Sequence, residues 1–222
     1  MKVGDEVIGF TDKRASHAEY VVAEARNLTP KPAGVAWEIA GSLAVAGSTA
    51  YAAVHAVSLK PGDTVAVSAA AGGVGSIAVQ LARRAGAKVI GIASPANHAW
   101  LSQHGVEAVA YGEDLVVRLR KFGFNAFIDC HGGGYVNLAI ELGVPQDRIN
   151  TIIDFAAARQ CGVKAKGSQE AQNSGTLAEL AGLVAEGKLD VPVAATFRLA
   201  DVRAAFKQLE QGHTRGKIVL AP

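Results

Sequence analysis

Residues 64–85 constrain the fold more than any other part of the chain. They run from a β-branched stretch at 64–68, through a loop of alanine and glycine at 69–75, into a helical pattern that ends near Ala85. A strand, a tight loop of small residues and a helix start let the backbone approach a phosphate closely and point free N–H groups at it. This segment therefore predicts the first strand, phosphate loop and helix of a Rossmann unit.

The loop is a variant of the G-x-G-x-x-G fingerprint. Gly72 and Gly75 keep the register of the last two glycines, and Ala69 stands at an earlier small position. A glycine-rich loop is a weak signal alone, because a glycine turn also serves close packing of a strand against a helix. Its place between a strand and a helix, followed by another strand, favours a pyrophosphate site.

Short β-branched runs alternate with helical patterns through the middle of the chain. This alternation predicts an α/β fold with a doubly wound parallel sheet, whose ligand crevice lies at the carboxyl ends of the strands. Strands are expected at 64–68, 88–93, 107–111, 125–129 and 149–154, and helices at 75–85, after Ser94-Pro95, at 112–122 and at 134–142.

The two ends of the chain have a different pattern. Short strands are expected at 3–10 and 18–22 with no helix between them. Near the other end, helices are expected at 177–189 and 201–211, and strands at 193–199 and 216–220. We expect both ends to form a β-rich unit beside the sheet, which divides the chain into regions 1–36, 37–165 and 166–222.

Composition excludes several classes of protein. The net charge is +2 and the basic residues are spread along the chain, which argues against a nucleic-acid partner. The two cysteines, Cys130 and Cys161, are too few for a disulfide framework or a four-cysteine metal site and fit a reducing cytoplasm. The first residues, Met-Lys-Val-Gly-Asp-Glu-Val, have no apolar signal-peptide core.

Two charge-free stretches, 39–59 and 64–82, are long enough to span a membrane. Both consist largely of alanine, glycine, serine and threonine, and they contain His55 and Gln80, so their transfer into lipid is unfavourable. We expect them in the buried core of a cytoplasmic protein without a membrane partner.

The end of the second expected strand bears on the choice between NAD and NADP. An NAD enzyme places a carboxylate on the ribose 2′-hydroxyl about 20 residues beyond the loop. Residues 92–98, Ile-Ala-Ser-Pro-Ala-Asn-His, contain none, and Ser94 with His98 or Asn97 can hydrogen-bond a 2′-phosphate. No Arg or Lys follows immediately, which weakens the electrostatic part of the prediction. NADPH is the expected cofactor.

Several segments together resemble one family. Residues 44–51 (Ala-Val-Ala-Gly-Ser-Thr-Ala-Tyr), 59–63 (Leu-Lys-Pro-Gly-Asp), 70–75 (Ala-Ala-Gly-Gly-Val-Gly) and 213–220 (His-Thr-Arg-Gly-Lys-Ile-Val-Leu) are similar, in order, to zinc-independent medium-chain dehydrogenases/reductases of the quinone oxidoreductase (zeta-crystallin-like) group. The resemblance implies an NADP-binding Rossmann domain between two halves of a GroES-like substrate domain. Only the tail of the first half is recognisable, so we expect an N-terminally truncated member whose two ends form a partial GroES-like domain.

The resemblance also implies that no metal is bound. Zinc alcohol dehydrogenases insert a four-cysteine loop where this chain has only residues 11–16, which contain no cysteine. Their catalytic-zinc cysteine would fall near Val45, which cannot bind a metal.

Carried over residue by residue, the resemblance implies a set of cofactor contacts. Thr49, expected at the start of the helix before the first strand, would face nicotinamide. The other expected contacts are Ala70, Gly72, Gly73 and Val74 at the pyrophosphate, Ser94, His98 and Tyr111 at the adenosine 2′-phosphate, Cys130, His131 and Gly132 on the adenosine side, and Phe155 and Ala156 near nicotinamide. Structural alternatives stay open: Cys130 as a buried apolar side chain, Tyr111 as a cap on the sheet edge, and His131 as a plain loop residue.

The implied chemistry is hydride transfer from NADPH to a quinone or to the β-carbon of an α,β-unsaturated carbonyl. No catalytic side chain is assigned, because solvent can protonate the product. A homodimer is expected through the last Rossmann strand at 149–154. The alternative is a catalytically impaired NADPH-binding or interaction module.

Other nucleotide-binding classes fit poorly. Short-chain dehydrogenases require Tyr-x-x-x-Lys, and no tyrosine here is followed by a lysine at that spacing. A P-loop hydrolase requires a lysine after Gly75, where Ser76 stands. A methyltransferase would place an acidic residue on the ribose, which is absent here.

Overall fold

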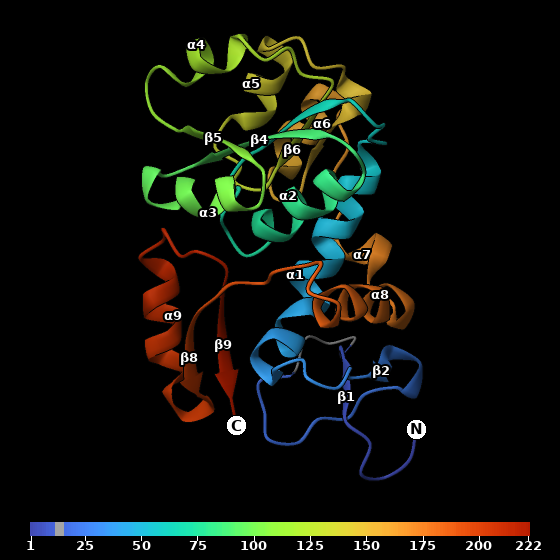
Figure 1. The fold of residues 1–222 in the computed structure, drawn as a ribbon. Coiled ribbons are helices and arrows are strands. Elements are labelled where there is room, and N and C mark those ends of the chain that lie inside the picture. Colours follow the sequence, from blue (N-terminus) through green and yellow to red (C-terminus); the bar gives the residue numbers. More distant parts are fainter. Residues whose placement is uncertain (12–15) are drawn as a thin grey trace.

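The computed structural model describes residues 1–11 and 16–222, and Figure 1 shows their arrangement. The strands are β1 Val7–Gly9, β2 Leu28–Pro30, β3 Thr64–Val67, β4 Lys88–Ala93, β5 Glu107–Ala110, β6 Ala126–Asp129, β7 Ile149–Thr151, β8 Val193–Arg198 and β9 Lys217–Ala221. The α-helices are α1 Trp37–Ala56, α2 Gly75–Arg84, α3 His98–Gln103, α4 Leu115–Arg120, α5 Tyr135–Glu141, α6 Phe155–Cys161, α7 Ser168–Ala171, α8 Ser174–Ala185 and α9 Val202–Glu210.

A parallel five-stranded sheet lies at the centre of the fold, with the order β5-β4-β3-β6-β7. β3 pairs with β4 on one side and with β6 on the other. The chain therefore leaves β3 in one direction, returns, and continues in the other. This is a doubly wound topology, and it confirms the predicted Rossmann α/β class.

Alternate residues of the strands enter two separate cores. Val65 and Val67 of β3 pack with α1, α2 and α3, whereas Ala66 packs on the opposite face with α4, α5 and α6. Figure 1 shows α2 and α3 on one side of the sheet and α4, α5 and α6 on the other. Because both faces are covered, the strands read as nearly continuous apolar runs rather than as an alternating pattern.

The helix α1 is the one described segment that is long and apolar enough to cross a membrane by length and composition. Its most apolar window is 61% buried, and it packs against α2, α7 and α8. It is therefore accommodated as a core helix. The other charge-free stretch, 64–82, is divided into β3, the loop and the first part of α2.

Both ends of the chain lie near the first part of α1, away from the five-stranded sheet (Figure 1). They form two small sheets: β1 pairs antiparallel with β2, and β8 pairs parallel with β9. The expectation of a strand at 18–22 is wrong, because β1 pairs with Leu28–Pro30 instead. Tyr20 and Val22 are 91% and 98% exposed, so this stretch has no packing surface that would hold it as a strand.

An ion pair ties the starts of two sheet strands together. Arg148, which precedes β7, donates to Asp63, which precedes β3, at 2.5 Å. Both side chains are largely buried. Burial alone would raise the pKa of Asp63, but the Lys60 backbone N–H and the Arg148 guanidinium outweigh it and hold that pKa below its usual value.

This ion pair predicts a loss of stability in acid. A carboxylate whose pKa is depressed in the fold stabilises it above the unfolded-state value of about 3.9, and this stabilisation is lost as the pH falls through the folded pKa. Asp63→Asn should lower the free energy of unfolding at neutral pH by about 2 kcal/mol, since it leaves a buried guanidinium without its counter-ion. Urea unfolding of both proteins at about pH 6 and about pH 3 measures this.

Glu141→Gln is the matched control, because Glu141 forms an exposed ion pair with Arg120. That variant should behave as wild type. Equal stability of Asp63→Asn and wild type at neutral pH would contradict the role given to the Asp63–Arg148 pair.

Candidate functional site

The candidate site lies at the carboxyl ends of the parallel strands, where the chain direction reverses between β3 and β6. In open α/β sheets this switch point leaves a crevice between the loops that follow the two strands. The loop after β3, at residues 69–75, and the loop after β6, at residues 130–134, border the crevice.

The loop after β3 has a backbone shape that depends on small residues. Ala69 adopts a left-handed conformation with φ 46°, and its carbonyl accepts from Gly72 N at 2.8 Å. A Cβ at position 75 would lie only 2.1 Å from the Ala69 carbonyl oxygen, so only glycine fits there. The loop leads directly into α2 and caps its first turn: Ser76 N donates to the Gly72 carbonyl and Ala78 N donates to the Val74 carbonyl, both at 2.9 Å. The predicted strand–loop–helix unit is therefore present.

The start of β9 packs directly on this loop. Gly216 N donates to the Ala71 carbonyl at 2.9 Å, and a Cβ at Gly216 would lie 1.9 Å from the Pro192 carbonyl oxygen. The next residue, Lys217, lies across Gly73: a Cβ built on Gly73 would be 2.9 Å from Lys217 Cδ and 3.6 Å from its Nζ.

Lys217 brings a positive charge to the loop. Burial lowers the pKa of its ammonium below the usual value, and no carboxylate among residues 1–11 and 16–222 lies within ion-pair distance of it. Together with the loop, Lys217 borders a cavity of 270 Å³ that is also lined by Cys130, Leu209 and Ile218. A half-buried cation beside the N-terminus of a helix is suited to a phosphate group.

Sequence reasoning missed Lys217 as a site residue. It stands in the closing motif at 213–220, where it is the one charged residue of an otherwise apolar strand. That contrast is a usable signal, but it does not say which loop the strand meets.

The pyrophosphate residues expected from sequence play different parts. Gly72, Gly73 and Val74 line the cavity. Ala70 is fully buried, and its N–H donates to the Ile92 carbonyl at 3.0 Å, so it serves the junction between β3 and β4 rather than offering a free donor.

The expected adenosine residues lie at the ends of β4 and β5. Ala93 is paired with Ala110, which makes Ser94 and Tyr111 neighbours at the crevice edge. Each side chain also has a polar contact of its own. Ser94 Oγ accepts from Asn97 at 3.1 Å, and the Tyr111 hydroxyl lies 3.3 Å from His213 Nδ1. His98 Nε2 lies 3.3 Å from the Ala93 carbonyl. Tyr111 is 45% exposed, so its hydroxyl is accessible.

A buried carboxylate organises the loop after β6. Asp129 is fully buried, and its Oδ1 accepts from Ser68 Oγ at 2.7 Å and from the N–H groups of His131 and Gly132, both at 2.9 Å. Its Oδ2 accepts from Thr151 Oγ1 at 2.7 Å. These bonds join the ends of β3, β6 and β7. Asp129 was not among the expected site residues, although a carboxylate at the end of a buried strand marks it.

Cys130 follows Asp129 and faces the cavity. Burial, and then the charge of Asp129, raises the pKa of the Cys130 thiol, so the thiol is neutral at physiological pH. Its backbone N–H donates to Ser68 Oγ at 2.8 Å. From sequence, Cys130 was either a cofactor contact or a buried apolar side chain. In the structure its neutral thiol is an apolar group, and it lines the cavity.

The residues expected near nicotinamide are spread over two elements. Phe155, which is half exposed, and Ala156 begin α6, whose N-cap Asp154 accepts from Ala157 N at 3.0 Å. The expectation that Thr49 starts a helix is wrong, because α1 begins at Trp37. An alanine-rich sequence sustains the helix across this region. Thr49 is buried within α1, and its hydroxyl donates to the Val45 carbonyl at 2.6 Å.

No group of three or more His, Cys, Asp or Glu side chains within residues 1–11 and 16–222 is arranged to hold a metal ion. The described residues therefore do not fit a zinc site, and we assign no step to zinc. Independence from zinc stays a prediction.

The sheet, the glycine loop and the switch-point crevice define a Rossmann-type α/β fold. A family model described as "Zinc-binding dehydrogenase" matches residues 90–220, which is more than half of the chain. The solved quinone oxidoreductase from Coxiella burnetii is 32% identical, with a TM-score of 0.89, over 99% of this chain and 73% of that one. The chain belongs to this dehydrogenase family and is a quinone-oxidoreductase-like medium-chain dehydrogenase/reductase.

Two further relatives extend the comparison. The chain is 30% identical to erythronolide synthase EryA2 of Saccharopolyspora erythraea over 98% of its own length, but this spans only 6% of that synthase. The structure of the CurK enoyl reductase is 25% identical, with a TM-score of 0.79, over 100% of this chain and 74% of that one.

The geometry of Gly73 predicts the effect of a side chain at this position. Gly73→Val should abolish NADPH binding, because the new side chain would displace Lys217 and occupy the space next to the loop. The affinity is measured by fluorescence titration, and circular dichroism checks the fold. Gly182→Val is the matched control, since a Cβ at Gly182 meets open space. Unchanged affinity in folded Gly73→Val protein would refute this placement of the pyrophosphate.

Proposed function

We propose that this chain binds NADPH across the strand ends and supports hydride transfer to a quinone or to an α,β-unsaturated carbonyl. The observation that carries the proposal is that the glycine backbone, the start of α2 and the half-buried Lys217 ammonium converge on one cavity, which we call the phosphate cradle. The bound dinucleotide would supply the hydride, and the protein would orient it and exclude water.

The cradle residues would have separate tasks. The backbone of Gly73 and Val74 would approach the pyrophosphate, while Lys217 would balance its charge. Ser94 and Tyr111 would hold the adenosine ribose and its 2′-phosphate. Two observations support this: Ser94 and Tyr111 follow the paired strands β4 and β5, and residues 92–98 at the end of β4 contain no carboxylate.

A second cavity suits an apolar hydride acceptor. It measures 810 Å³ and shares Leu209, Lys217 and Ile218 with the loop cavity. Val45 of α1 also lines it, one helical turn before Thr49, the expected nicotinamide contact. We propose that a quinone or enone binds here, beside the reactive end of the cofactor. The names of two similar proteins, a quinone oxidoreductase and an enoyl reductase, indicate substrates of these two kinds.

A module without turnover is the alternative function. The cradle is formed by the glycine loop, the start of α2 and β9, so cofactor binding does not depend on a completed substrate cavity. The cavity for the acceptor, in contrast, is lined by segments from both ends of the chain, at 7–11 and 217–222. Binding without turnover is therefore physically consistent with the fold.

A homodimer through the last Rossmann strand, a cytoplasmic location and a small-molecule partner stay proposals. The outer edge of β7 is hydrogen-bonded to the following segment: Thr151 N donates to Lys164 O and Lys164 N donates to Ile149 O, both at 3.0 Å. Pairing between two copies would therefore use the segment around Lys164 rather than β7 itself.

The proposed enzyme and the module differ in one assay. The purified chain is titrated with NADPH and with NADH, and a quinone or an enone is then added while the absorbance of the reduced nicotinamide is recorded. We expect saturable binding that is at least about tenfold tighter for NADPH, since a 2′-phosphate contributes charge-assisted hydrogen bonds. Oxidation on adding the acceptor supports the enzyme. Binding without oxidation supports the module, and binding of neither nucleotide contradicts both.

Removal of the Lys217 charge should weaken binding. Lys217→Met keeps the length of the side chain, and we expect NADPH affinity to fall by about 10- to 100-fold, because a hydrogen bond to a charged group contributes about 1.5–3 kcal/mol. Calorimetry measures the dissociation constant. Lys207→Met is the control, because it removes the same charge from the exposed face of α9. Equal affinities of the two variants would exclude Lys217 from the site.

A further inference from the structure

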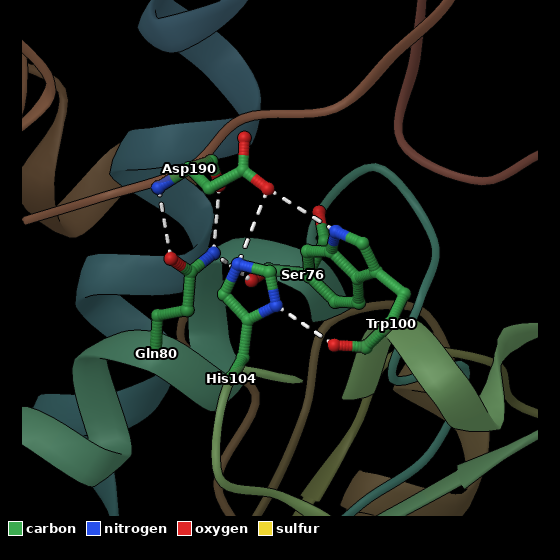
Figure 2. Close-up of polar contacts among 5 residues, drawn as sticks. All are labelled: Ser76, Gln80, Trp100, His104 and Asp190. Carbon is green, nitrogen blue, oxygen red and sulfur yellow. Dashed lines mark hydrogen bonds and ion pairs between the residues drawn. The ribbon is translucent and has the colours of Figure 1, made fainter. Parts of the chain in front are cut away.

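The segment between α8 and β8 is fixed to the Rossmann unit at Asp190. Gln80 of α2 binds its backbone in both directions: Asp190 N donates to Gln80 Oε1 at 2.8 Å, and Gln80 Nε2 donates to the Asp190 carbonyl at 2.7 Å. Gln80 Nε2 also donates to the Ser76 carbonyl in the first turn of α2, at 2.7 Å. Figure 2 shows this arrangement.

The Asp190 side chain contacts Trp100 of α3 and His104, the residue that follows this helix. Its Oδ2 accepts from Trp100 Nε1 at 3.1 Å and pairs with His104 Nε2 at 3.2 Å. The Trp100 and His104 rings are tilted by 33° to each other with their centroids 4.1 Å apart, and Figure 2 shows both rings turned toward the same carboxylate oxygen. We call Gln80, Trp100, His104 and Asp190 the Asp190 clamp.

His104 contributes two polar contacts to the clamp. Its Nε2 lies 3.2 Å from Asp190 Oδ2, and its Nδ1 lies 2.8 Å from the Trp100 carbonyl oxygen. The imidazole therefore bridges the Asp190 side chain and the backbone of α3.

The clamp is connected to the phosphate cradle through two residues. Asp190 is followed by Val191 and Pro192, and the Pro192 carbonyl accepts from Lys217 N at 2.8 Å. The same carbonyl is in close contact with Gly216, which docks on the glycine loop through Ala71. The position of residues 190–192 thus sets the position of the backbone that carries Lys217.

We propose that Asp190 is a positioning residue for Lys217 and that its contacts with Gln80, Trp100 and His104 hold it in place. This inference rests on the proposed function, since it assigns to the clamp the control of cofactor affinity at the phosphate cradle. The side chain of Asp190 touches neither cavity. It acts through Pro192 and Lys217.

A double-mutant cycle separates positioning from a general structural effect. Asp190→Asn, Lys217→Met and the double variant are compared by their dissociation constants for NADPH. We expect Asp190→Asn to weaken binding by about fivefold in the wild-type background and to have little effect in the Lys217→Met background. Equal weakening in both backgrounds would show that the clamp does not act through Lys217, and would overturn the proposal.

A second measurement needs no cofactor. The rate at which an amine-reactive anhydride labels Lys217 is followed by mass spectrometry in wild type and Asp190→Asn, with the exposed Lys207 as internal reference. We expect faster labelling of Lys217 alone in the variant, by about fivefold, and equal rates would overturn the positioning role. If wild type fails to bind NADPH while the labelling changes as expected, the proposed function fails and the mechanical link from Asp190 to Lys217 stands.

Discussion

The contact between the glycine loop and the start of β9 is the constraint on which the rest of the site depends. It is a contact of backbone with backbone, because Gly216 N donates to the Ala71 carbonyl at 2.9 Å and Gly216 forms an isolated parallel bridge with Gly72. Each side of the contact needs a glycine: a Cβ at Gly75 would lie 2.1 Å from the Ala69 carbonyl oxygen, and a Cβ at Gly216 would lie 1.9 Å from the Pro192 carbonyl oxygen. A side chain at either position would therefore distort its own segment. This contact brings the C-terminal strand to the switch point of the sheet, and it places Lys217 on the loop.

Charge is distributed around this contact in an ordered way. Asp129 is buried beneath the crevice. Its carboxylate accepts hydrogen bonds from donors at three strand ends and so holds the loops together. Lys217 lies half-buried against the loop without a carboxylate partner among the described residues, so its charge is available to a ligand. The structure thus separates an anion that organises the site from a cation that faces it. A dinucleotide would meet the second and not the first.

The sequence was sufficient for the sheet but not for the connections between its ends. The strands β3, β4 and β6 follow from β-branched runs between turn residues, and the phosphate loop follows from the small residues at 69–75. The start of α1 could not be placed, because an alanine-rich sequence contains no cap that marks Trp37. Residues 18–22 have strand-like composition, but their side chains remain exposed, so propensity alone misled the prediction there.

The missed site residues share one cause. Lys217 meets Gly73, and Asp190 meets Gln80 across a separation of 110 residues; no local pattern encodes such contacts. Gln80 illustrates this: in sequence it counted only as a polar residue within an apolar stretch, yet its amide anchors the segment that leads to β9. Contacts of this kind follow from packing, and they determine the details of the site more than its motifs do.

The central claim is that a pyrophosphate lies on the loop at 69–75 beneath Lys217, and amide NMR tests it most directly. Isotope-labelled protein is titrated with NADPH, and the shifts of individual backbone amides are followed. The account predicts that the largest changes occur at Val74, Gly75 and Ser76 and at the backbone of Lys217. Saturable binding that leaves these amides unmoved, with changes confined to the chain ends at 7–10 and 193–198, would contradict it.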